Sequence, residues 1–133
     1  MTLSIIPIYA GILALIYLAL TIRTVLARRK FSIALGHRDA PQLMRNVRAH
    51  GNFSEYVPIL LILIALLEIQ NFSPLFIHIF GCVLVASRIS HAFGISNVKE
   101  NFAFRIAGMV PTMLLLLITG LINLYLAVCK TAF

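Results

Sequence analysis

A stripe of polar side chains lies within the second long apolar run of this chain. If residues 45 to 59 form a helix, at about 100° per residue, Arg48, Asn52 and Glu55 fall within roughly 60° of one another. Arg45 and Tyr56 widen that arc to about 100°. A carboxylate at mid-depth in a membrane costs about 2–4 kcal/mol, so such a residue is usually functional or paired. This face is therefore the first candidate for a ligand site.

The other apolar runs bring four further cations to the same end of the expected fold: Arg28, Arg29, Arg88 and Arg105. His91 lies in the same layer. A polar network that only fixes helix packing is one interpretation of this layer. Such a network is expected to balance its charges, because an uncompensated buried cation is costly. The surplus of positive charge favours an anionic ligand instead, either a lipid phosphate or a small peptide-like polyanion.

Composition decides what kind of protein must position these residues. The chain has 133 residues, of which 61% are hydrophobic and 11% charged, with 11 Lys and Arg against 4 Asp and Glu. An average soluble domain is about 45–50% apolar and about 25% charged. A soluble globule and a disordered chain are therefore excluded. No nucleic-acid partner is expected, because the basic residues interrupt long apolar runs rather than form a solvated patch.

The apolar runs predict four membrane-spanning helices, at about residues 5–27, 42–68, 72–93 and 105–128. Each is long enough to cross a hydrocarbon core of about 30 Å. Because the connections are short, we expect one all-α domain over residues 1–133, an up-down four-helix bundle integral to the membrane.

The distribution of cations predicts the orientation of the bundle. Ten of the eleven Lys and Arg lie toward the ends of the spans that would meet at one membrane face, and only Lys130 lies at the other. The positive-inside rule places the cation-rich end in the cytoplasm and both termini outside. The short loops are typical of a prokaryotic protein, so we expect a multi-pass protein of the bacterial inner membrane.

The stripe also carries a recognisable motif. Residues 48–58 read RAHGNFSEYVP, and the pattern R-A-x-x-N-x-x-E-Y-x-P in a second span resembles the signature of the MAPEG family (membrane-associated proteins in eicosanoid and glutathione metabolism). Residues 27–31, ARRKF, are similar to the basic end of that family's first helix. Residues 88–94, RISHAFG, are similar to the end of its third, and Arg105 to the arginine that opens its fourth.

The resemblance implies a homotrimer that binds glutathione in a U-shape between neighbouring subunits, near the cytoplasmic face. The residues that match the family's glutathione contacts within one subunit are Arg48, Asn52, Glu55, Tyr56, His91 and Arg105. Arg28 and His50 match positions that reach the ligand from the adjacent subunit, and His50 falls nearly opposite the stripe on the helical wheel. Arg105 matches the arginine that activates the thiol, so it is the expected catalytic residue.

Glutathione fits the charges of the stripe. Arginine binds its carboxylates through charge-assisted bonds, and Glu55 suits its ammonium group. A free thiol has a pKa near about 8.5, which a nearby guanidinium in a partly dry site lowers. The predicted activity is that of a glutathione transferase or peroxidase, with the thiolate attacking a lipophilic electrophile or a lipid hydroperoxide that arrives from the membrane lipid.

Several residues depart from the family's eicosanoid branches: Ile95 replaces a tyrosine, and Gly51 and Ile106 replace an arginine and a serine of the prostaglandin E synthase branch. They argue against prostaglandin isomerase activity. A MAPEG-like protein that binds glutathione or lipid without turnover is the alternative function. A proton-coupled drug exporter is a third, disfavoured because Glu55 lies close to Arg48. His78 and Cys82 share a helix face, but two ligands make no metal site.

Overall fold

The computed structural model describes residues 3–99 and 101–131. It contains four helices, α1 (Ile6–Phe31), α2 (Pro41–Ile69), α3 (Pro74–Ile95) and α4 (Phe102–Thr131). All four are long and apolar enough to cross a membrane. The predicted all-α class and four-helix bundle are therefore confirmed.

The helix ends follow local sequence signals. A proline occupies the first turn of α1, α2 and α3, where its missing N–H has no helical partner to lose. α1 ends at Ser32, which adopts the left-handed conformation (φ 53°) and donates its N–H to the last-turn carbonyls of Arg28 and Arg29. The N–H of Phe104, in the first turn of α4, lies 3.3 Å from the side-chain oxygen of Asn101. That contact explains why α4 begins before Arg105.

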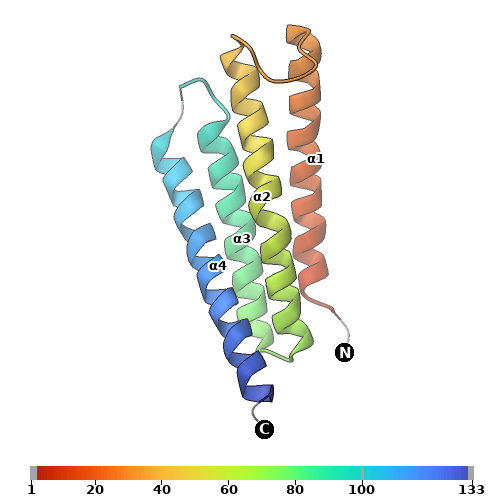
Figure 1. Cartoon of the computed structure of the whole chain (residues 1–133), viewed down its shortest axis with the longest axis vertical. Helices are drawn as coiled ribbons and strands as arrows, with labels where there is room; N and C mark the ends of the chain where they lie inside the picture. Colours follow the sequence, from red (N-terminus) through yellow and green to blue (C-terminus); the bar gives the residue numbers. More distant parts are fainter. Residues whose placement is uncertain (1–2, 100, 132–133) are drawn as a thin grey trace.

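The helices run alternately up and down, so both ends of the chain lie at the same end of the bundle as the short α2–α3 turn (Figure 1). The α1–α2 and α3–α4 loops lie at the opposite end (Figure 1). α3 and α4 form the most extensive interface, and α2 contacts all three other helices. Within the described residues α1 and α4 make no contact, so the bundle is open between them.

The core is a set of apolar side chains that recur at helical spacing. On α2 the buried residues Phe53, Val57, Leu60, Ile64 and Leu67 follow one another at intervals of three or four, as an inward face requires. The outer faces of all four helices expose large apolar side chains instead. That inversion of the soluble pattern suits helices surrounded by lipid.

Two glycines bring α3 and α4 into backbone contact at the end of the bundle that carries the stripe. A Cβ atom on Gly94 would lie 2.5 Å from the backbone nitrogen of Arg105. A Cβ atom on Gly108 would lie 2.4 Å from the backbone nitrogen of His91. Small residues permit this approach in membrane helices. Arg105, in the first turn of α4, therefore lies directly against the end of α3.

The other end of the bundle is held by Glu68, near the end of α2. Its Oε1 atom accepts hydrogen bonds from the backbone N–H groups of Ser4 and Ile5, both at 2.7 Å. Its Oε2 atom accepts from the N–H of Ile6 at 2.8 Å. Because Ile5 has no side-chain acceptor of its own, this carboxylate takes the place of an N-cap for α1.

Candidate functional site

Arg88 on α3 is the centre of a polar cluster between α2 and α3. The side chain is 1% exposed, and its Nη1 atom donates to Oδ1 of Asn52 at 2.9 Å. Its guanidinium carbon lies 5.7 Å from the centroid of the Tyr56 ring, within the range of a cation–π contact. Arg88 on α3 thus contacts two stripe residues of α2, Asn52 and Tyr56.

His91 and Arg105 lie in the same layer. His91 follows Arg88 by one turn of α3 and is 5% exposed. Arg105 is half-buried, and its backbone packs against Gly94, one turn beyond His91. The close approach of α3 and α4 therefore brings together two residues that the sequence predicted for one site.

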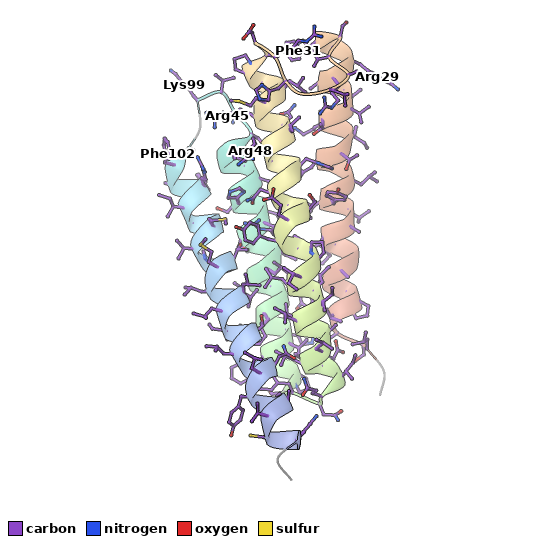
Figure 2. The ribbon with its side chains drawn as sticks, viewed as in Figure 1. Arg29, Phe31, Arg45, Arg48, Lys99 and Phe102 are labelled. Atoms are coloured by element: carbon purple, nitrogen blue, oxygen red, sulfur yellow. The ribbon has the colours of Figure 1, made fainter. Side chains whose placement is uncertain are left out.

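Arg48 and Glu55 occupy the outward side of the stripe, where both side chains are exposed. Among the residues that the structure describes, neither makes a hydrogen bond or an ion pair. Figure 2 shows Arg45 and Arg48 at the end of the bundle that also carries Lys99 in the α3–α4 loop and Arg29 and Phe31 at the end of α1. The cations thus gather at one end, as the charge distribution predicted.

Arg28 and His50 are placed apart from the stripe, with partners in their own chain. Arg28 uses Nη1 to hold the α1–α2 loop, donating to the carbonyl oxygens of Ala34 and Gly36, both at 3.0 Å. His50 packs against α1, with its Nε2 atom 3.1 Å from the Thr21 hydroxyl. His50 therefore faces away from the stripe, as the helical wheel predicts. Its predicted contact with a neighbouring subunit stays a prediction.

An apolar groove of about 210 Å³ runs between α1 and α2 next to His50. Tyr17 forms part of its wall, and its ring stacks on both His50 (centroids 4.7 Å apart) and Phe53 (5.7 Å). The remaining lining is apolar apart from Ser54. A lipophilic molecule of modest size fits the chemistry of such a groove.

His78 and Cys82, which the sequence placed on one helix face, both contact Tyr9. The Tyr9 hydroxyl lies 2.9 Å from His78 Nδ1 and 3.4 Å from Cys82 Sγ. Over residues 3–99 and 101–131, no three His, Cys, Asp or Glu side chains are grouped closely enough to hold a metal ion. Tyr9 thus gives both side chains a hydrogen-bonding role within the bundle.

Comparison with known proteins identifies the family. The MAPEG family model matches residues 6–125. The chain belongs to the MAPEG family. A relative, Inner membrane protein YecN of Escherichia coli strain K12, is 32% identical to this chain over 118 residues, covering 89% of this chain and 88% of that protein. The protein of the same name from Escherichia coli O6:H1 strain CFT073 has the same identity and coverage. No solved structure matches the chain.

Family and fold together place this MAPEG protein in a bacterial inner membrane, which it crosses several times. Both ends of the chain lie at one end of the bundle, opposite the clustered cations (Figures 1 and 2). The orientation with both termini outside the cytoplasm stays a prediction from that charge distribution.

The sequence predicts Arg88 as one of the layer's cations but not as a site residue. Its central position depends on how α2 and α3 are rotated against each other, which a single helical wheel does not give. The available signal was its spacing of three residues from His91, since residues so spaced share a helix face. His91 is a predicted site residue, and the same face carries Arg88.

Proposed function

We propose that this MAPEG protein is a membrane-bound glutathione transferase with peroxidase capacity, acting as a homotrimer. The thiolate sulfur of glutathione forms a bond to an electrophilic carbon as the leaving group departs. With a lipid hydroperoxide, the O–O bond breaks instead, one glutathione is oxidised to a sulfenic acid, and a second glutathione completes a disulfide. The lipid alcohol and water are released.

The observation that carries the proposal is the outward side of α2. Arg48 and Glu55 are exposed there, on a helix apolar enough to span a membrane. Charged groups facing hydrocarbon are costly, by about 3 kcal/mol each, so this face needs a protein or ligand cover. A neighbouring copy of the chain together with an ionic ligand would cover this face and pair its charges. Family membership makes glutathione the favoured ligand.

Each predicted residue has a role that follows from its chemistry. Arg48 binds a carboxylate of glutathione and Glu55 its ammonium, with Asn52 between them along α2 and Tyr56 one residue beyond Glu55. His91 contacts the ligand from α3. Arg105, held against the end of α3, stabilises the thiolate.

Arg28 and His50 act from the neighbouring subunit in this proposal. Their bonds within the chain are compatible with such a role. Within the described residues, Arg28 holds its loop through Nη1 alone and His50 contacts Thr21 through Nε2, so each keeps a further nitrogen for a ligand. The electrophile enters from the lipid, and the groove between α1 and α2 beside Tyr17 offers it an apolar surface.

Glutathione titration and turnover in detergent test the proposal. We expect saturable heat on calorimetry with glutathione, and conjugation of 1-chloro-2,4-dinitrobenzene or reduction of a lipid hydroperoxide. Arg105→Ala should abolish turnover, whereas Lys99→Ala, which removes an exposed cation of the nearby loop, should not. Binding without turnover on either substrate would establish the non-catalytic alternative. No heat with millimolar glutathione on well-folded protein would refute the proposal.

A further inference from the structure

The contact between Arg88 and Asn52 fixes which half of the Asn52 amide is left for a ligand. Arginine carries only hydrogen-bond donors, so the amide atom 2.9 Å from Arg88 Nη1 must be the oxygen. The NH2 group of Asn52 is then on the other side of the amide. Within the described residues that NH2 group makes no hydrogen bond. Asn52 is half-buried, and its NH2 nitrogen is not among the buried side-chain atoms that lack a partner, so the group is accessible.

The neighbours of Arg88 do not compensate its charge. Its Nε and Nη2 atoms are buried and have no hydrogen-bond partner in the part of the chain that the structure describes. Among the described residues, the guanidinium contacts the face of the Tyr56 ring and the amide of Asn52. A buried guanidinium with unused donors is costly for folding, so packing alone does not account for it. Such a guanidinium is well suited to fixing the orientation of the Asn52 amide and to providing a positive potential near a bound ligand.

We propose that Arg88 is a positioning residue that turns the NH2 group of Asn52 toward the ligand, so that this position recognises an acceptor, a carboxylate or carbonyl oxygen. Glu55, three residues further along α2 on the same face, then takes the ammonium group. The bound molecule is therefore oriented along the helix, with acceptor groups at Arg48 and Asn52 and the ammonium group deeper in the membrane. This inference rests on the proposed binding of glutathione.

Asn52→Asp tests the two halves of the amide separately, because it keeps an acceptor oxygen and removes the NH2 group. The carboxylate still accepts from Arg88 and supplies the missing counter-charge, so we expect a higher thermal midpoint than that of Asn52→Ala. It has no N–H to offer and repels a ligand carboxylate, so we expect glutathione affinity to fall by at least about ten-fold. Asn46→Asp is the matched control. Asn46 lies on α2, as Asn52 does, but away from the site, and its side-chain oxygen accepts from Nη2 of Arg23 on α1 at 3.2 Å. The affinity of Asn46→Asp should stay within about two-fold of the wild type.

A double-mutant cycle tests whether Arg88 acts through Asn52. We expect Arg88→Gln to weaken glutathione binding by roughly ten-fold in the wild-type background and by less than about two-fold in the Asn52→Ala background. A structural role alone would give the same loss in both backgrounds and would overturn the inference. If Arg88→Gln fails to fold, Asn52→Asp decides the question, and wild-type affinity in that variant would refute the proposed orientation.

The two proposals fail in different ways. Wild-type protein that does not bind glutathione refutes the proposed function. In that event the thermal midpoints still test the amide orientation, because Asn52→Asp must exceed Asn52→Ala if the oxygen faces Arg88. Glutathione binding that is unchanged in Asn52→Asp refutes only the positioning role.

Discussion

Replacing Glu68 should loosen the first turn of α1 without touching the ligand site. The Glu68 carboxylate accepts the backbone N–H groups of Ser4, Ile5 and Ile6 at 2.7–2.8 Å. It also lies 3.2 Å from the Ser4 hydroxyl. Glu68→Ala leaves these donors to water or to the membrane interface. Glu68→Gln keeps one acceptor oxygen and loses the charge.

The expected magnitude follows from these contacts. Loss of an N-cap side chain costs about 1 kcal/mol, and loss of a negative charge at a helix N-terminus costs about 0.3–1 kcal/mol. Because the carboxylate accepts from three successive N–H groups rather than one, we expect the free energy of unfolding to fall by about 2 kcal/mol in Glu68→Ala. Glu68→Gln, which retains one oxygen, should lose about 1 kcal/mol.

The measurement is unfolding in mixed detergent micelles, followed by circular dichroism because the chain has no tryptophan. Hydrogen exchange at the start of α1 should increase in parallel, while exchange in α3 stays unchanged. Ser73→Ala is the control at the same end of the bundle, since the Ser73 side chain caps no helix. A Glu68→Ala protein whose unfolding free energy lies within about 0.5 kcal/mol of the wild type would refute the reasoning.

Two further predictions concern packing and orientation. Gly108→Val should destabilise the protein by at least about 3 kcal/mol, seen as a loss of folded yield and thermal midpoint, because a Cβ atom there meets the backbone of Ser87 and His91; a variant as stable as the wild type would show that α3 and α4 do not pack this closely. In a Cys82→Ser background, exposed Cys129 should react with a membrane-impermeant maleimide from outside intact cells, and Lys99→Cys with Cys129 removed should not; the reverse pattern would invert the proposed orientation.

Much of the site could be predicted from the sequence because it depends on a single helix. Arg48, Asn52 and Glu55 share a face by spacing alone, and the structure places all three on α2 with Arg48 and Glu55 outward. The spans could be predicted because hydropathy is a local property. The fold class followed from the short connections between them.

The parts that could not be predicted depend on contacts between helices. The Arg88–Asn52 bond joins residues 36 positions apart and requires the relative rotation of α2 and α3. The Glu68 contacts with the start of α1 join residues more than 60 positions apart. Gly108 looks like any membrane-helix glycine in the sequence, and its role appears only when α3 is placed against it.

The glycine contacts between α3 and α4 constrain how the molecule can deform. Because Gly94 and Gly108 are in backbone contact with the opposite helix, α3 and α4 are held tightly together near the stripe. A bulky guest from the bilayer cannot part them there. An apolar groove already lies between α1 and α2, so a guest from the bilayer can be taken up there without separating α3 from α4. The admission of guests should therefore depend on the mobility of α1, while Arg105 keeps its place beside His91.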